Sequence, residues 1–291
     1  AALAAAAGSR VVGRDDHVLA AAALMGGLGR EHLLVVQPGT SLVVGTISSL
    51  DIILCTGARE QYPRPVQMAA GPTVGEFLAE QKHGTPACQA DATLSDAAKL
   101  LLSSGRTAVV VSGEGGTPPS LLNEIDIMRA LVDGWPCDTS VKRWMLSQES
   151  HWSRRPQHLL VQPSVLLTEA ATRLLNAGIQ SRIPCHHLIV QGSAEAAEWL
   201  GVFSTLDVAR ALSHLDSELD VSRTGADQAT VASVMKRAVP RCKAGDLLVQ
   251  VLHVLLSSGQ HCALVAEGAG LRGVVTPRCA VRAFAAGAPR D

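Results

Sequence analysis

Aromatic residues are scarce in this chain, and neither sign of charge dominates it. Phe, Trp and Tyr together make up 3% of the 291 residues, although 47% of the residues are hydrophobic. The core must therefore consist mainly of alanine, valine and leucine. The formal net charge is −1, so the sequence lacks the basic excess that is typical of proteins that bind nucleic acid or anionic membranes.

Long apolar runs, paired cysteines and catalytic motifs are also missing. No hydrophobic stretch approaches the roughly 20 residues that a membrane-spanning helix requires. The seven cysteines are scattered singly, without a Cys-x-x-Cys motif, which favours reduced thiols and a cytoplasmic location. His186 and His187 follow Cys185, but neighbouring strand residues point to opposite faces, so no metal site is predicted. No Ser/His/Asp set or pair of acids indicates an enzyme.

The sequence does contain a short segment that occurs four times. In 200–212 an apolar strand runs into Ser204, and a helix leaves from it with Asp207 three residues further on. Serine is a favourable N-cap, and an acid three residues later forms a capping box. The copies are 45–52, 120–127 and 273–280. Their spacing of about 70–80 residues predicts small units with several elements each.

Each copy ends a predicted unit of the order β-α-β-β-α. In the first unit we expect strands at 11–12, 32–36 and 42–47 and a helix at 17–28 that stops at Gly29. Corresponding helices are predicted at 94–104, ending at Gly105, and at 166–176, ending at Gly178. The sequence Leu-Leu-Ser-Ser-Gly occurs at 101–105 and again at 255–259, which indicates duplication.

Four repeats are predicted in two pairs, the first with the second and the third with the fourth. Because the chain starts with Ala1 and the first repeat lacks an opening segment, we expect repeat 1 to be truncated. Segments rich in proline or polar residues predict linkers at 58–72 and 213–228. The predicted repeats are 1–57, 73–134, 141–215 and 230–287.

The repeated pattern resembles the CBS domain, named after cystathionine beta-synthase. The pattern is Val-x-x-x-Met (141–145 and 231–235), a strand, a helix ending in glycine, an apolar strand, a turn, and then Gly, two apolar residues and Ser/Thr-x-x-Asp. The resemblance implies an α+β fold in which the four repeats pair into two Bateman modules. In that family, clefts between repeats commonly hold adenosine nucleotides, as in the gamma subunit of AMP-activated protein kinase.

The resemblance also implies a role for the residues at the repeated segment. The Ser/Thr would face phosphate or ribose, and the Asp would accept hydrogen bonds from the ribose hydroxyls. A helix N-terminus suits phosphate, and a carboxylate makes strong charge-assisted hydrogen bonds. By position the expected site residues are Ser48, Asp51, Asn123, Asp126, Ser204, Asp207 and Thr276. Repeat 4 has Cys279 in place of the acid.

The family often places a basic residue before the middle strand, facing phosphate. His32 holds this position in repeat 1 and His261 lies near it in repeat 4. Repeat 3 offers either Arg182 or His187, depending on where an insertion at 180–185 is placed. Repeat 2 has Thr107 and Ala108 there, and hence no basic residue.

The sequence thus predicts a non-enzymatic regulatory protein that binds AMP, ADP or ATP and modulates a protein partner, such as a kinase or another regulated enzyme. Two alternatives remain open. In the first, the chain is a ligand-free scaffold in which each Ser/Thr-x-x-Asp is only a helix cap. In the second, it is the regulatory portion of a larger enzyme, transporter or channel.

Overall fold

Four small sheets organise the part of the chain that the structure describes. This computed structural model describes residues 11–55, 72–81, 84–112, 119–134, 159–181, 185–192, 199–216, 229–268 and 270–285. In these residues each sheet has three strands that are consecutive in the chain. The first two strands of each sheet are parallel, and the second and third are antiparallel. This is the predicted α+β arrangement.

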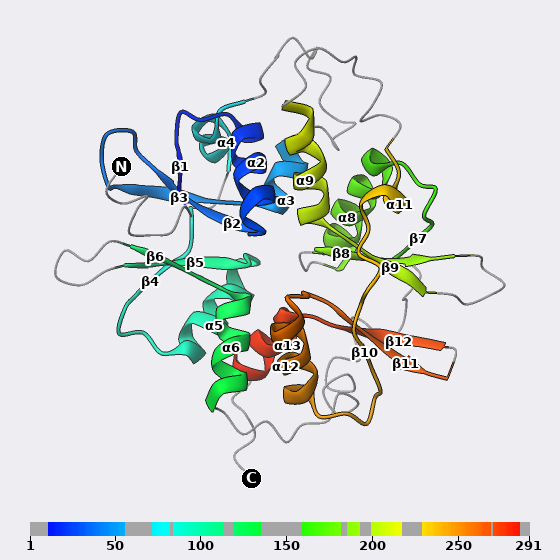
Figure 1. Ribbon diagram of the computed structural model, residues 1–291. Coiled ribbons are helices and arrows are strands. Elements are labelled where there is room, and N and C mark those ends of the chain that lie inside the picture. The colour runs from blue at the N-terminus through cyan, green and yellow to red at the C-terminus, as the bar shows by residue number, and fades with distance from the viewer. Residues whose placement is uncertain are drawn as a thin grey trace.

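Repeats 1 and 2 occupy the first half of the chain and share this order (Figure 1). A helix connects the parallel strands, and a second helix follows the last strand directly. Repeat 1 contains β1 (Val11–Gly13), α2 (Val18–Leu28), β2 (His32–Val36), β3 (Val43–Ser48) and α3 (Ser49–Cys55). Repeat 2 contains α4 (Val74–Glu80), β4 (Ala87–Gln89), α5 (Leu94–Ser104), β5 (Ala108–Ser112), β6 (Ser120–Asn123) and α6 (Glu124–Gly134).

Repeats 3 and 4 repeat the order in the second half. Repeat 3 contains β7 (Leu160–Val161), α8 (Leu167–Ser181), β8 (His187–Gln191), β9 (Trp199–Ser204) and α9 (Thr205–Asp216). Repeat 4 contains α11 (Val231–Val234), β10 (Arg241–Cys242), α12 (Leu248–Ser258), β11 (Ala263–Glu267), β12 (Gly270–Val275) and α13 (Pro277–Ala285). The predicted opening segment 141–145 and most of both predicted linkers lie outside the described residues.

Glycines end three of the helices, as predicted for the first two. Gly29, Gly105 and Gly259 follow α2, α5 and α12 with φ of 63°, 67° and 62°, a left-handed conformation that favours glycine. Two predictions about helix ends were wrong. Helix α8 continues through Gly178 to Ser181, and α9 continues to Asp216, so 213–216 belong to a helix rather than to a linker.

The sheets pair as predicted, repeat 1 with repeat 2 and repeat 3 with repeat 4. Leu34 of β2 packs against Ala108 and Val110 of β5, and Ile189 of β8 packs against Leu264 of β11. These contacts form two Bateman modules. The short helices α4 and α11 lie within repeats 2 and 4 in the sequence, but each packs on the preceding repeat. Val74 of α4 packs in the core of repeat 1, and Val231 of α11 packs in the core of repeat 3.

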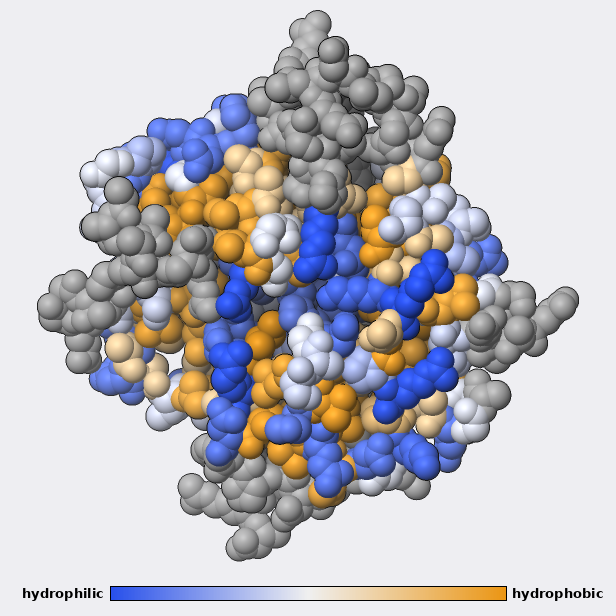
Figure 2. Space-filling view, in the orientation of Figure 1, coloured by the Kyte–Doolittle hydropathy of each residue, from blue (hydrophilic) through white to orange (hydrophobic). Residues whose placement is uncertain are grey.

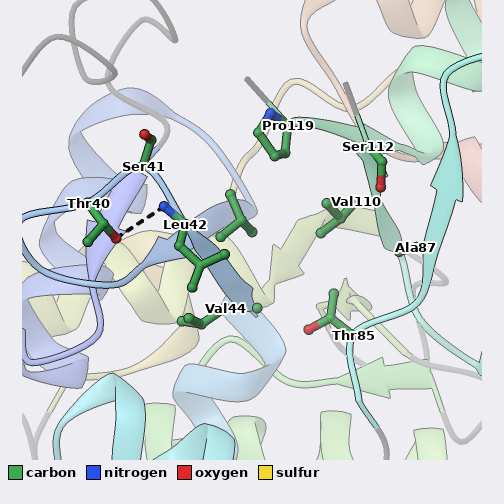
Figure 3. A pocket seen from close by; sticks show the side chains of 11 residues that line it. Thr40, Ser41, Leu42, Val44, Thr85, Ala87, Val110, Ser112 and Pro119 are labelled. Carbon is green, nitrogen blue, oxygen red and sulfur yellow. Dashed lines mark hydrogen bonds between the residues drawn. The ribbon is translucent and has the colours of Figure 1, made fainter. Parts of the chain in front are cut away.

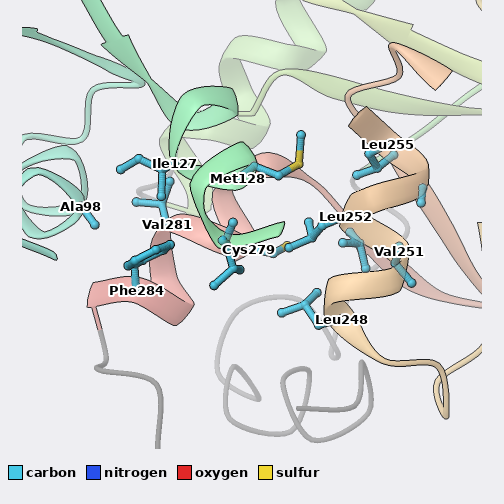
Figure 4. Packing of buried hydrophobic residues seen from close by; sticks show 14 of the residues in the cluster. Ala98, Ile127, Met128, Leu248, Val251, Leu252, Leu255, Cys279, Val281 and Phe284 are labelled. Atoms are coloured by element: carbon cyan, nitrogen blue, oxygen red, sulfur yellow. The ribbon is translucent and has the colours of Figure 1, made fainter. Parts of the chain in front are cut away.

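Helices join the two modules. Helix α9 of repeat 3 packs on α2 and α3 of repeat 1, and α13 of repeat 4 packs on α5 and α6 of repeat 2. In Figure 4, Phe284 and Val281 of α13 lie beside Ile127 of α6 within this second contact. The four repeats therefore surround a common centre (Figure 1), and the strand-to-helix corners approach it from all sides.

Candidate ligand sites at the strand-to-helix corners and at the centre

The corner between β3 and α3 is closed by a reciprocal cap. The Ser48 backbone N–H and hydroxyl donate to Asp51 Oδ2, at 2.9 and 2.7 Å, and the Asp51 N–H donates to Ser48 Oγ at 3.2 Å. The corner between β9 and α9 has the same geometry. Ser204 donates to Asp207 Oδ2 at 2.8 and 2.7 Å. Each acid thus uses one carboxylate oxygen to cap the start of its own helix.

Repeats 2 and 4 build the same corner from other residues. The Asn123 N–H donates to Asp126 Oδ2 at 3.0 Å, and Asn123 Oδ1 accepts from the Asp126 N–H at 3.1 Å. In repeat 4 the Thr276 N–H donates to Cys279 Sγ at 3.2 Å. A thiol therefore suffices to hold the corner, and the helix does not require the acid.

The second oxygen of Asp51 meets side chains of repeat 2. Arg106 Nη1 lies 3.5 Å and Gln81 Nε2 3.4 Å from Asp51 Oδ1, and Arg106 Nη2 also donates to Gln81 Oε1. We call these three residues the repeat 1 clasp. Arg106 was missed from the sequence, where only Thr107 and Ala108 were considered. Its signal is that it directly follows the helix-ending Gly105.

The second oxygen of Asp207 has a different neighbour. Arg210, one turn further along the same helix, lies 3.4 Å from Asp207 Oδ1 and is 37% exposed. Asp207 is only 2% exposed. Burial raises its pKa, although the hydrogen bonds from Ser204 and the charges of Lys236 and Arg210 act in the opposite direction. Repeat 4 contributes the charge of Lys236, but none of its described residues donates a hydrogen bond to this carboxylate.

A cavity of about 190 Å³ lies at the centre, where residues of all four repeats meet. Its lining includes Glu31 and His32 of repeat 1, Glu124 of repeat 2, His186 and His187 of repeat 3, and His261, Thr276 and Arg278 of repeat 4. Figure 2 shows hydrophilic residues across the middle of the visible face. The volume is below that of pockets that enclose a whole drug-sized ligand, roughly 300–1,000 Å³.

Two ion pairs cross this cavity. His261 Nδ1 lies 2.9 Å from Glu31 Oε1, and Arg278 Nη1 lies 2.6 Å from Glu124 Oε1. Burial opposes ionisation of Glu31, but the hydrogen bond and charge of His261 outweigh it and hold the Glu31 pKa well below its ordinary range. Burial raises the pKa of Glu124 despite Arg278. Each pair joins two repeats.

Two of the histidines that the sequence suggested as basic residues, His32 and His187, are neutral at pH 7. His32 Nε2 lies 2.5 Å from Thr107 Oγ1, and burial lowers the His32 pKa to about 4. Burial also lowers the His187 pKa to about 3. At neutral pH both rings can donate or accept a hydrogen bond, but they offer no positive charge to a phosphate. Arg182 lies outside the described residues.

His186 has a spare ring nitrogen. Its Nδ1 lies 3.3 Å from Thr205 Oγ1, which in turn lies 2.8 Å from Ser49 Oγ of repeat 1. The buried Nε2 has no hydrogen-bond partner among the described residues. The ring is thus a polar group at the centre that could serve a ligand.

The buried cysteines Cys185, Cys242 and Cys279 are not reactive thiols. Burial raises the pKa of Cys185 and Cys279 to about 11 and that of Cys242 to about 12, so these thiols are protonated. The described residues contain no cluster of three or more His, Cys, Asp or Glu side chains suited to a metal ion. Every helix in the described part also falls short of the length or apolarity that crossing a bilayer requires.

A second groove, of about 700 Å³, opens between the sheets of repeats 1 and 2. Figure 3 shows Leu42 and Val44 on the repeat 1 side, with Val110 and Ala87 on the repeat 2 side. None of the described residues that line it is charged. The groove therefore offers shape and apolar surface, but no partner for a phosphate.

Comparisons with known proteins agree with the fold. No family model matches the sequence, and no curated protein matches it. A CBS-domain-containing protein of Agrobacterium tumefaciens is 20% identical and covers 52% of this chain and 96% of its own, with a TM-score of 0.39. An uncharacterized conserved protein of Pyrococcus horikoshii is 19% identical over 87% of this chain and 91% of its own, with a TM-score of 0.52.

One solved structure matches nearly end to end. A protein of Methanocaldococcus jannaschii, described as a proposed archaeal homolog of g-AMPK, has a TM-score of 0.74 at 20% identity and covers 94% of this chain and 95% of its own. The chain has the four-repeat CBS fold. At this identity the likeness establishes the CBS fold alone, so the use of the CBS corners has to be argued from their own residues.

Proposed function

We propose that this chain is a regulatory, non-enzymatic CBS protein that binds an adenosine ligand at the corner of repeat 3. Asp207 would accept hydrogen bonds from the ribose hydroxyls, and Ser204 and the start of α9 would face the 5′ side. Binding would alter how the two modules pack and would be passed to a protein partner, such as a kinase. AMP, ADP and ATP are the first ligands to test.

Asp207 is the observation that carries this proposal. A carboxylate that is 2% exposed and raised in pKa by burial costs stability. Cys279 holds the equivalent corner of repeat 4 without an acid. Capping alone therefore does not explain Asp207, whereas a ribose would supply two hydroxyl donors for its second oxygen. The adenosine part of the proposal comes from the resemblance of the repeated segment to CBS domains, whose clefts commonly hold adenosine nucleotides.

A thermal-shift screen with adenosine, AMP, ADP, ATP and S-adenosylmethionine tests the proposal. At least one compound should raise the melting temperature of the wild type, because a ligand that binds only the folded state stabilises it. Asp207→Cys, which copies the corner of repeat 4, should keep the fold and lose the shift. Its affinity should fall about 10- to 100-fold, since one charged hydrogen-bond acceptor is removed.

Asp126→Cys serves as the matched control, because it makes the same change at a corner whose acid lies partly exposed beside Arg129. It should leave the shift unchanged. If no compound shifts the wild type, or if Asp207→Cys retains the full shift, the ligand-free scaffold becomes the better description. Repeat 1, with its clasp, and repeat 4, with its cysteine, already resemble closed corners of such a scaffold.

A further inference from the structure

The central cavity already contains its own anions. Glu31 and Glu124 lie 13% and 12% exposed, and their partners His261 and Arg278 lie 18% and 12% exposed. Arg278 Nη1 also donates to the Arg106 carbonyl oxygen at 2.7 Å. His261 and Arg278 are therefore already engaged by acids of this chain before any ligand arrives.

The 5′ side of a ligand at the repeat 3 corner would face this cavity. In β8 and β9, His187 is the register partner of Ser204, and both His186 and His187 line the cavity. The N–H of Thr205 at the start of α9 donates to the His186 carbonyl oxygen at 3.0 Å. A phosphate that entered here would find one of the first helix donors already used and an uncharged imidazole beside it.

A phosphate chain would also come close to the two carboxylates. Displacing either acid would strand a charged group in a cavity of about 190 Å³, and an unpaired buried charge is strongly unfavourable. Arg30 and Arg129 line the cavity as well, but both are exposed, where water and salt weaken their attraction for an anion. The spare Nε2 of His186 suits a neutral polar group equally well.

We infer that Glu31 and Glu124 act as built-in counter-anions that determine ligand specificity. They exclude a phosphate chain from the centre, and the ligand of the repeat 3 corner is an adenosine derivative whose 5′ group is uncharged or cationic. This inference rests on the proposed function for the adenosine part. The exclusion of anions from the centre stands on the cavity itself.

Calorimetric titration of the full chain with adenosine, ATP and pyrophosphate tests the inference. Wild type should bind adenosine at least about tenfold more tightly than ATP, a difference of about 1.4 kcal/mol. Glu31→Gln keeps the shape of the side chain and its amide can still form a hydrogen bond with His261. This variant should gain about tenfold in affinity for ATP and for pyrophosphate, while its affinity for adenosine changes less than about twofold.

Glu267→Gln is the control, because Glu267 forms an exposed ion pair with Arg272 away from the cavity. It should bind all three compounds as the wild type does. The inference is overturned if the wild type binds ATP as tightly as adenosine, or if Glu31→Gln gains no affinity for pyrophosphate. If no adenosine compound binds but Glu31→Gln gains pyrophosphate binding, the proposed function fails and the anion exclusion stands.

Discussion

The corners of repeats 1 and 3 have the same cap but different neighbours. Ser48 with Asp51 and Ser204 with Asp207 form matching hydrogen bonds to one carboxylate oxygen. The other oxygen of Asp51 faces Arg106 and Gln81, which come from the next repeat. That of Asp207 meets Arg210 of its own helix, and Lys236 of repeat 4 acts on it through its charge. The local sequence therefore defines the corner, and the paired repeat decides which side chains meet the second carboxylate oxygen.

A single position accounts for much of this difference. The residue after the helix-ending glycine is Arg106 in repeat 2 and Gln260 in repeat 4. Arg106 reaches across the module to Asp51, whereas Gln260 lines the central cavity. Duplicated repeats can thus keep one fold while the side chains around each corner differ.

The largest expected effect is a loss of folding stability in acid. It is caused by two histidines at equivalent places, His32 of repeat 1 and His187 of repeat 3. Their folded-state pKa values of about 4 and 3 lie below the ordinary value of 6.5. Their contribution to stability is therefore complete above pH 6.5 and is lost as the pH falls towards the folded-state values. Each should cost about 1.4 kcal/mol per pH unit in that window.

Denaturant unfolding between pH 7 and pH 4.5 measures this effect. Both folded-state values lie below this range, so His32→Gln and His187→Gln should each flatten the pH dependence by a similar amount. Glu124 and Asp207 have raised pKa values, which act in the opposite direction as the pH falls. If both variants keep the pH dependence of the wild type, the two rings are not held neutral in the folded protein.

A smaller effect on folding stability is expected from substituting the glycines that precede the two corners, Gly45 and Gly201. A side chain at Gly201 would collide with the Lys236 backbone carbonyl, whereas at Gly45 the nearest atom would be Leu78 Cδ1, at 2.9 Å, in a flexible side chain. Gly201→Ala should destabilise the protein by about 2–3 kcal/mol and Gly45→Ala by about 1 kcal/mol, because backbone yields less readily than a side chain. Thermal unfolding of the two variants provides the comparison, and equal losses would contradict it.

The sequence predicted the repeats and the corners well because both depend on local chemistry. The N-cap residues, the acid three positions later and the stops at Gly29 and Gly105 act within one turn of helix. The stop at Gly178 was wrong, since packing of α8 holds a glycine that its intrinsic propensity disfavours. Residues 213–216 were assigned to a linker because they are polar, although they continue α9.

The centre could not be predicted from the sequence, because its contacts join distant segments. Glu31 and His261 are 230 positions apart, and Glu124 and Arg278 are 154 apart. Neither pair belongs to a motif. Arg106 was missed for the same reason, since its partner Asp51 lies 55 positions earlier.

A last comparison exchanges the two deciding residues. Arg106→Gln removes the cation beside the Asp51 carboxylate, whose side chain is only 7% exposed, so it should cost about 1–3 kcal/mol. It should open the repeat 1 corner and add a second, weaker binding event in calorimetry. Gln260→Arg should close the repeat 3 corner and weaken ligand binding about tenfold. Two unchanged binding curves would mean that this position does not decide which corner is open.

The central claim is that Asp207, and not Asp51, holds the ligand. Its most direct test is a calorimetric titration of wild type, Asp51→Cys and Asp207→Cys with the compound that gives the largest thermal shift. Wild type should bind one equivalent per chain, Asp51→Cys should bind with the same affinity, and Asp207→Cys should bind about 10- to 100-fold more weakly. Loss of binding in Asp51→Cys together with full binding in Asp207→Cys would contradict the account.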